Sequence, residues 1–439
     1  MERESMTFDV VIVGGGPAGL SSACRLMQLA KAQHAELSVC VLEKGSEIGA
    51  HIMSGAVLET TALDELFPDW QSQNAPVNVA VEQDETFYFS SSNHARKIPQ
   101  FAVPNSMHNQ GNYLVSMGNL CRWLAEQAEA LGVDVFSGFA AQEVLYEENK
   151  VVGILTQDMG IDSEGQHKDS FMPGMELRAK YTIFAEGCRG HLGKMLINKF
   201  QLAKEKSIQH YALGFKEIWD VPQENHHTGL VQHSAGWPLE NQTGGGGYLY
   251  HTENQQVVVG LIVDLNYQNP YLDPFAEFQR YKHHPQVAKY LSGGKRVAYG
   301  ARAITKGGLN ALPKQTMPGA ILVGCDAGTL NSAKIKGNHT AMKSGMLAAE
   351  TIFEALSSGD IGGNDLLNYD NSFKQSWLYK ELYKHRNFTS IMHKYGTFIG
   401  AVVNTVNVNW LNNKLPMNCR HELQEHEKED HERLVIASE

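Results

Sequence analysis

Near the N-terminus, two apolar runs flank a stretch whose apolar residues recur at helical spacing. Residues 8–13 (FDVVIV) form a short apolar run rich in β-branched residues, which is typical of a buried parallel strand. Residues 20–30 (LSSACRLMQLA) carry apolar positions at helical spacing, and residues 37–42 form a second apolar run. Strand, helix and strand in this order predict the start of a Rossmann-like α/β domain.

The middle of the chain has a different pattern. Residues 205–303 contain alternating strands such as HYALGFKEIWDV and QVVVGLIVDL, which predict an antiparallel sheet. Residues 151–156 and 176–184 are predicted to form a hairpin with a long polar excursion between them. We therefore expect an α/β fold with an inserted α+β domain.

A glycine-rich turn joins the first strand to the first helix. It reads Gly14-Gly15-Gly16-Pro17-Ala18-Gly19. Strand, Gly-x-Gly-x-x-Gly and helix is a dinucleotide fingerprint, in which the pyrophosphate lies on the helix N-terminus. Glu43 ends the second strand, where it can accept a hydrogen bond from a ribose hydroxyl. The fingerprint serves both NAD and FAD, and a turn without a ligand is the simpler alternative.

A second motif far downstream favours FAD. An apolar strand ends in Gly324-x-Asp326, and Gly337-Asn338-His339-Thr340 then opens a helix of small residues. The aspartate could accept hydrogen bonds from the ribityl hydroxyls of FAD, and the helix dipole would stabilise negative charge on a reduced flavin. Residues 181–188 (YTIFAEGC) form a third strand-to-glycine turn, and Arg122 could reach the pyrophosphate or lie on the surface.

Composition excludes several classes of function. The chain has 439 residues, of which 37 are Lys or Arg and 48 are Asp or Glu, so the net charge is −11. This charge argues against a nucleic-acid-binding protein. The six cysteines form no C-x-x-C pair, which argues against a metal site built on close cysteine pairs. No run of 18 apolar residues and no leader segment is seen.

Three further segments have two interpretations each. Gly244-Gly245-Gly246-Gly247, which precedes Tyr248, could admit a flat ligand against bare backbone or form a flexible hairpin loop. Residues 49–70 and 396–410 are apolar and end in tryptophan. Such segments can lie at a membrane surface or pack as core helices.

The chain resembles the electron transfer flavoprotein–ubiquinone oxidoreductase family along essentially its whole length. The most specific stretches are residues 293–303 (GGKRVAYGARA) and 334–350 (KIKGNHTAMKSGMLAAE). Others are VIVGGGPAGL, VLEKGSEIGAHIMSGAVL, ELFPDW, FAEGCRGHLGK and LNYQNPYLDPFAEFQRYKHHP.

This resemblance implies an FAD-dependent oxidoreductase that passes electrons from reduced electron transfer flavoprotein to ubiquinone. It implies that Gly245 and Gly246, with Tyr248, line the quinone site, and that residues 49–70 and 396–410 contact the membrane. The location implied is peripheral, on the cytoplasmic face of a bacterial inner membrane or the matrix face of the mitochondrial one. The expected FAD-binding residues are Gly14, Gly15, Gly16, Pro17, Ala18, Gly19, Glu43, Lys44, Arg122, Gly187, Gly324, Asp326, Gly337, Asn338, His339 and Thr340.

The resemblance also implies a domain layout. We expect a discontinuous FAD-binding domain, a ubiquinone-binding domain and a C-terminal membrane-surface segment with a linker. The FAD-binding domain would comprise residues 1–80, 105–204 and 304–395. The ubiquinone-binding domain would comprise residues 81–104 and 205–303, and the C-terminal segment residues 396–439.

Members of this family carry a [4Fe–4S] cluster in a further C-terminal domain. The four cysteine ligands of that cluster have no counterpart in this sequence, so we expect no metal ligands and an impaired electron input. Three alternatives stay open: an FAD-dependent monooxygenase, an isoprenoid-lipid reductase, or a non-catalytic FAD-binding fragment.

Overall fold

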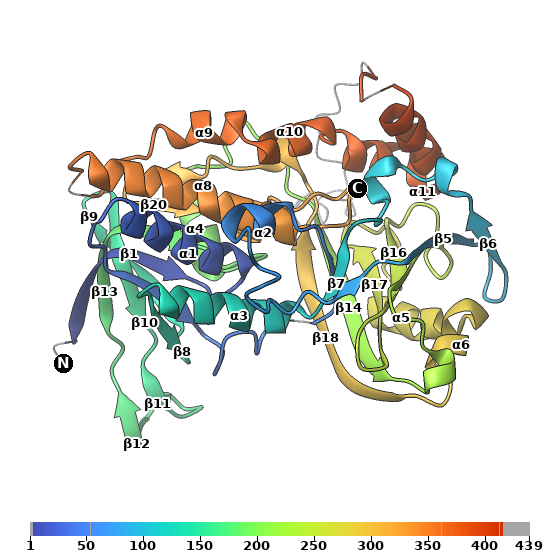
Figure 1. The fold of residues 1–439 in the computed structure, drawn as a ribbon, viewed down its shortest axis with the longest axis horizontal. Helices are drawn as coiled ribbons and strands as arrows, with labels where there is room; N and C mark the ends of the chain where they lie inside the picture. Colours follow the sequence, from blue (N-terminus) through green and yellow to red (C-terminus); the bar gives the residue numbers. More distant parts are fainter. Residues whose placement is uncertain (1–2, 53, 361, 412, 416–439) are drawn as a thin grey trace, which may run out of the picture.

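The N-terminal strand lies at the centre of a mainly parallel sheet. The computed structural model describes residues 3–52, 54–360, 362–411 and 413–415. The sheet has the order β19-β20-β13-β1-β2-β8, and the predicted α/β fold is confirmed (Figure 1). Its strands are β1 (Ser5–Val13), β2 (Val39–Glu43), β8 (Asp134–Ser137), β13 (Glu176–Phe184), β19 (Thr316–Met317) and β20 (Ala320–Leu322).

Two further strands extend this sheet. β10 (Lys150–Thr156) pairs antiparallel with β13, and β9 (Ala141–Glu147) pairs with β10. The hairpin predicted from residues 151–156 and 176–184 is therefore confirmed. The polar excursion within it forms a small hairpin of its own, made of β11 (Met159–Ile161) and β12 (His167–Met172).

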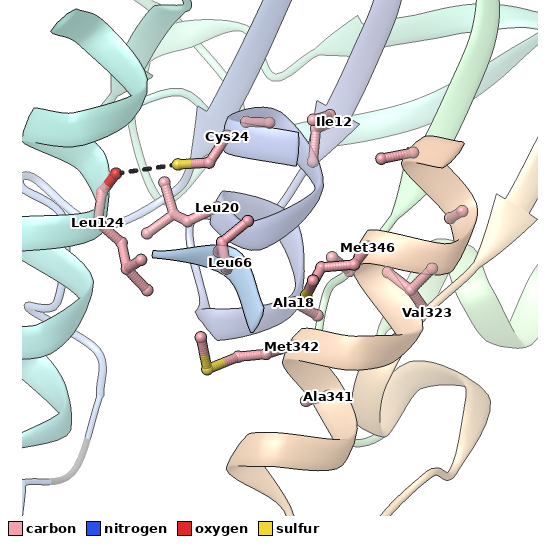
Figure 2. Close-up of a cluster of buried hydrophobic side chains, with 14 of the residues drawn as sticks. Ile12, Ala18, Leu20, Cys24, Leu66, Leu124, Val323, Ala341, Met342 and Met346 are labelled. Carbon is pink, nitrogen blue, oxygen red and sulfur yellow. Dashed lines mark hydrogen bonds between the residues drawn. The ribbon is translucent and has the colours of Figure 1, made fainter. Parts of the chain in front are cut away.

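Helices cover one face of the parallel sheet. α1 (Pro17–Ala32) packs between α3 (Met117–Ala130) and α8 (Asn338–Ser357), and side chains such as Leu20 and Met342 fill the space between them (Figure 2). The thiol of Cys24 donates to the carbonyl of Leu124 at 3.5 Å in this core. On the other face, α4 (His191–Lys199) packs with β9 and β10.

A second, seven-stranded sheet makes up the other half of the structure. Its order is β18-β14-β17-β16-β15-β5-β6, and α5 (Pro274–His283) and α6 (Pro285–Leu291) cover one face of it (Figure 1). The predicted antiparallel sheet is thus present, with one parallel pair between β5 and β15. Its strands are β5 (Gln83–Phe89), β6 (Ala95–Ile98), β14 (Tyr211–Asp220), β15 (Leu230–Gly236), β16 (Gly245–His251), β17 (Gln256–Asp264) and β18 (Lys295–Thr305).

The large apolar side chains of residues 57–70 are buried in the core, which contradicts the prediction that segment 49–70 contacts a membrane. This segment contains β3 (Ala56–Leu58) and α2 (Thr61–Leu66), and β3 pairs with β7 (Tyr113–Val115), which also pairs with β4 (Val79–Ala80). Phe67 and Trp70 are only 7% and 5% exposed. The apolar face of this segment is covered by α1, α3 and α8, which leaves none for a bilayer.

The C-terminal helices run from α8 toward the seven-stranded sheet. They are α9 (Tyr369–Gln375), α10 (Trp377–Lys384) and α11 (Phe388–Asn409), and α11 is broken at Gly396, whose φ is 74°. No helix in the described ranges combines the length and the hydrophobicity needed to cross a membrane. The remaining short helices are η1 (Gln100–Ala102), η2 (Asn105–Met107), η3 (Gln223–Asn225), η4 (Leu309–Ala311) and α7 (Gly324–Ala327).

Candidate functional site

A cavity of about 1740 Å³ lies between the parallel sheet and the seven-stranded sheet. Its wall includes the glycine-rich turn, the start of α8 and the glycine run that begins β16. A typical small-molecule pocket holds about 300–1,000 Å³. The cavity is therefore large enough for a dinucleotide together with a second ligand.

The glycine-rich turn leaves the N-terminus of α1 open toward this cavity. A Cβ at Gly14 would lie 2.4 Å from the carbonyl oxygen of Ala185, and one at Gly19 would lie 2.1 Å from that of Gly14. A Cβ at Gly16, by contrast, would meet no atom within 4 Å. Gly16 caps α1 without a side-chain hydrogen bond, so the first backbone N–H groups of the helix are free to bind an anion.

Glu43 is held at the edge of the cavity by backbone amides. Its carboxylate accepts hydrogen bonds from the N–H of Gly15 at 3.0 Å and the N–H of Gly45 at 2.7 Å. A carboxylate can accept about four hydrogen bonds, so acceptor capacity remains for a ligand hydroxyl. Lys44 follows it on the cavity wall.

Asp326 lies half-buried beside the cavity, and one of its carboxylate oxygens is buried without a partner among the described residues. Among the described residues its Oδ2 has no hydrogen-bond partner, and a Cβ at Gly193 would lie 2.2 Å from its Oδ1. Burial, reinforced by the nearby Glu186, raises the pKa of this carboxyl well above its usual value. Asp326 does not line the cavity, although the adjacent Cys325 does. The unpartnered oxygen of Asp326 is positioned to accept a hydrogen bond from a hydroxyl of a ligand bound against α7.

The start of α8 presents a second open helix N-terminus. Gly337 precedes it without a side-chain cap, and Gly337 and Asn338 line the cavity. His339 and Thr340 turn away from it. The Thr340 hydroxyl donates to the carbonyl of Gly337 at 2.9 Å, and His339 Nε2 lies 2.9 Å from Glu381 Oε1.

His339, Glu59 and Glu381 form a cluster with the composition of a metal site, since one ligand atom of each lies within 4.8 Å of the others. The Lys334 ammonium, however, donates to both carboxylates at 2.7 Å. Burial alone would raise the pKa of Glu381, but His339 and Lys334 lower it far below its usual value. Lys334 thus provides the positive charge that a metal ion would otherwise supply to these carboxylates. The contact between His339 and Glu381 attaches the start of α8 to α10.

The cavity gathers most of the predicted site residues, and a few lie elsewhere. Arg122 is one of these: it lies on α3, donates to Asn119, and has Glu47 3.9 Å away. Gly15, Gly19, Gly324, Asp326, His339 and Thr340 also lie outside the cavity lining. Those that line it are Gly14, Gly16, Pro17, Ala18, Glu43, Lys44, Gly187, Gly245, Gly246, Tyr248, Gly337 and Asn338.

The last three glycines of the tetraglycine run begin strand β16, so the loop interpretation is wrong. Gly245 begins β16 with φ +142°, and its Cβ would lie 2.1 Å from the carbonyl oxygen of Ile262. A Cβ at Gly247 would lie 2.2 Å from the ring of Tyr281. The glycines therefore allow the strands and the ring to approach closely, and they leave bare backbone on the cavity wall.

Several cavity residues were not anticipated from the sequence. Lys216 on β14, His233 on β15 and Tyr250 on β16 line the same cavity. His233 Nε2 lies 3.0 Å from the Tyr250 hydroxyl, and burial lowers the pKa of His233 to about 4, which keeps it neutral. Strand alternation could place these residues on a common face, but only the packing of the two sheets shows that this face borders the cavity.

The rim of the cavity is apolar and exposed. Phe398 and Val402 of α11 are 57% and 53% exposed, and Trp410 just after it is 70% exposed. All three line the cavity, together with Phe101 of η1, which is 76% exposed. An exposed apolar rim at the mouth of a cavity is typical of a site that takes a ligand from an apolar phase.

Comparisons with known proteins fit this arrangement. A family profile described as "ETF-QO, ubiquinone-binding" matches residues 211–304, and one described as "NAD(P)-binding Rossmann-like domain" matches residues 12–68. The chain is 61% identical over 419 residues to the electron transfer flavoprotein-ubiquinone oxidoreductase of Pseudomonas aeruginosa, covering 95% of this chain and 76% of that protein. It is 53% identical to a probable electron transfer flavoprotein-ubiquinone oxidoreductase of Acinetobacter baylyi, over 97% of this chain and 77% of that protein.

Solved structures with low sequence identity share the fold. A geranylgeranyl bacteriochlorophyll reductase-like protein from Thermoplasma acidophilum is similar, with a TM-score of 0.65 at 20% identity, over 93% of this chain and 97% of that one. A flavin-dependent brominase is similar with a TM-score of 0.60 at 15% identity, over 99% of both chains.

Proposed function

The chain belongs to the electron transfer flavoprotein–ubiquinone oxidoreductase family, and we propose that it takes electrons from reduced electron transfer flavoprotein and passes them through FAD to ubiquinone. The observation that carries this proposal is the shared cavity. One wall has the features of a dinucleotide site, and another belongs to the segment that matches the ubiquinone-binding profile.

The residues present fit FAD. The amides of the Gly14–Gly16 turn and of the α1 N-terminus would hold the pyrophosphate, and Glu43 would bind a ribose. Asp326 would accept from a ribityl hydroxyl, and the α8 N-terminus would lie near the ring. When bound, the flavin accepts two electrons and passes them on, so the protein itself needs no nucleophile.

The quinone would lie against the bare backbone of β16. Gly245 and Gly246 provide a flat wall there, and Tyr248 and Ala235 border the same part of the cavity. This wall orients the quinone ring without bulky side chains, while Phe89 and Tyr281 pack behind the sheet. Enclosure between the two sheets keeps water away from the ring.

We propose that the quinone enters from a membrane to which the protein binds peripherally. The apolar rim formed by Phe398, Val402 and Trp410 would lie in the bilayer interface, where the isoprenoid tail is soluble. The structure describes all of residues 396–410. Asn412 and residues 416–439 of the predicted C-terminal segment lie outside the described residues. For a bacterial chain, the membrane would be the inner one, on its cytoplasmic face.

Among the described residues, no group of three or more cysteines lies close enough together to hold a metal ion. Cys24 and Cys121 are fully buried, and burial raises the pKa of each thiol to about 12. Cys419 lies outside the described residues.

The experiment that tests the proposed function supplies reduced electron transfer flavoprotein and a short-chain ubiquinone to the FAD-loaded chain. We expect quinol formation that requires all three components. Ala235→Phe should raise the KM for the quinone while FAD stays bound, because Ala235 borders the same wall as Gly246. NADPH-dependent hydroxylation of an aromatic acid, with no quinone reduction, would contradict the proposal and favour the monooxygenase alternative.

The membrane proposal has its own matched variants. Val402→Asp places a charge on the apolar rim, whereas Leu367→Asp places one at an apolar residue that is 74% exposed and lies outside the cavity lining. We expect Val402→Asp alone to weaken sedimentation with vesicles of phosphatidylethanolamine and phosphatidylglycerol. Equal vesicle binding by the two variants would contradict the placement of the rim.

A further inference from the structure

A lysine on the quinone-side sheet directs unpaired donors into the cavity. Lys216 lies in β14, and its side chain lines the cavity. Its ammonium donates one hydrogen bond, to the carbonyl of Gly55 at 2.6 Å. An ammonium has three N–H donors, so two are without a partner among the described residues. A ligand in the cavity can reach them.

Lys216 differs from Lys306, another lysine of the cavity wall, in its lack of an anionic partner among the described residues. Lys306 forms an ion pair with Asp264, but no described carboxylate lies within 4 Å of the Lys216 ammonium. Burial lowers the pKa of Lys216 to about 8, and this loss of hydration is the only cause of the shift. Lys216 is therefore an acid whose proton is removable near neutral pH.

The groups that face Lys216 from neighbouring elements are neutral or cationic. Its Nζ lies 5.8 Å from the centre of the Tyr248 ring on β16. The guanidinium of Arg302, on β18, donates to the carbonyl of His51. His51 lies four residues before Gly55, whose carbonyl accepts from Lys216. Burial raises the pKa of the Tyr248 phenol far above neutral, so that phenol stays protonated at any pH used below.

The register of the strands places Lys216 on the same face as the quinone wall. Lys216 pairs with Gly260 of β17, and Gly260 pairs with Tyr248 of β16. A Cβ at Gly260 would lie 2.3 Å from the Tyr248 hydroxyl, so the ring lies across this glycine toward Lys216. Gly246 lies two positions before Tyr248, on the same face of β16.

Reduction of a quinone consumes two protons for every two electrons, and the proposed cavity is largely apolar. Resting on the proposed function, we propose that Lys216 donates one of these protons to a quinone oxygen. One N–H bond of the ammonium breaks and one O–H bond of the quinol forms, while the flavin supplies both electrons. The neutral amine then regains a proton from water after the quinol leaves. The second quinol proton comes from solvent, to which reoxidation of the flavin returns the proton that the reduced flavin carried.

A comparison of two electron acceptors tests this proposal. The FAD-loaded chain is reduced by light and mixed in a stopped-flow instrument with short-chain ubiquinone or with ferricyanide, which accepts electrons without protons. Lys216→Met should slow flavin reoxidation by the quinone about 100-fold, the lower end of general acid–base effects. Reoxidation by ferricyanide should stay within twofold. In the unmodified chain, the quinone rate should fall as the pH rises through about 8, and Lys216→Met should lose this dependence.

Lys216→Arg separates proton donation from charge. Arginine keeps the positive charge but does not lose its proton near neutral pH, so this variant should be as slow with the quinone as Lys216→Met. Lys295→Met, at the exposed end of the neighbouring β18, is the matched control and should leave both rates unchanged.

Three results would overturn the proposal: equal slowing with both acceptors, wild-type quinone rates in Lys216→Arg, or a pH dependence that survives in Lys216→Met. A different result refutes the proposed function instead. An unmodified reduced chain that gives electrons to ferricyanide but not to the quinone would show that the cavity does not serve a quinone at all.

Discussion

Helices α1 and α8 cross so closely that a single methyl group should force them apart. Gly345 of α8 faces α1, and a Cβ there would lie 2.2 Å from the carbonyl oxygen of Ala18 and 2.6 Å from the hydroxyl oxygen of Ser22. An ordinary van der Waals contact needs more than 3.4 Å, and the first of these atoms belongs to the backbone. Gly345→Ala therefore requires the two helices to separate by about 1 Å.

Two opposing effects set the magnitude. Alanine in a helix interior is more favourable than glycine by about 1 kcal/mol. Overpacking of a rigid core costs about 1–3 kcal/mol, and separation of the helices also disturbs the packing of Met346 and Leu20, which are fully buried. We expect a net loss of about 1 kcal/mol in the free energy of unfolding, measured by urea denaturation.

The same variant should release FAD more readily. α1 and α8 both begin at the cavity, so a shift of their crossing displaces two sets of amides that would hold the cofactor. Gly118→Ala on α3 is the control, because its Cβ would meet the Gly49 carbonyl oxygen at 3.4 Å, an ordinary contact. If Gly345→Ala were as stable as the unmodified chain and retained FAD equally well, the argument from close approach would be refuted.

Two further variants probe other parts of the fold. Burial alone would raise the pKa of Asp264, but Lys306 and His393 lower it from 3.8 to about 2. Its charge therefore stabilises the folded state above about pH 4, by about 2 kcal/mol, and this stability is lost as the pH falls toward 2. Urea denaturation between pH 6 and pH 3 should show that loss, and Asp264→Asn should lack it; an identical acid dependence in both would contradict the assignment. Trp70→Ala should cost about 3–5 kcal/mol, because the buried indole also donates to Asp64 at 2.7 Å, yet vesicle binding of the folded variant should not change. Weakened vesicle binding without loss of stability would restore a membrane role for this segment.

The sequence predicted the nucleotide half well because its signals are local. The turn from Gly14 to Gly19 needs positive φ and close backbone approach, which only glycine allows, so its composition specifies its geometry. Glu43 is fixed by its position at the end of β2, since the Gly15 amide lies opposite that strand end. Both features follow from a single strand–turn–helix–strand unit.

Segments whose environment depends on distant elements could not be predicted in the same way. The apolar stretch that ends at Trp70 has the pattern of an interfacial helix, and only the arrival of α3 and α8 covers it. The tetraglycine run has the composition of a flexible loop, but the Tyr281 ring on α5 and the carbonyls of β17 require those glycines in a strand. The role of Lys216 could not be predicted either. Alternation along β14 assigns it to one face of the sheet but does not show that this face borders the cavity.

Small residues explain how separate motifs become one site. A Cβ at Gly324 would lie 2.8 Å from the Cβ of Ala18 and 3.5 Å from that of Ala341, so α7, α1 and α8 meet at three residues without larger side chains. The close crossing at Gly345 continues this contact along α1 and α8. A helix pair that crosses at such short range places both N-termini on one wall of the cavity, as a dinucleotide with a pyrophosphate and an anionic ring requires. The small residues of α8 at this crossing are therefore a requirement of its packing against α1, and substitutions there should affect cofactor retention before they affect the stability of the sheet.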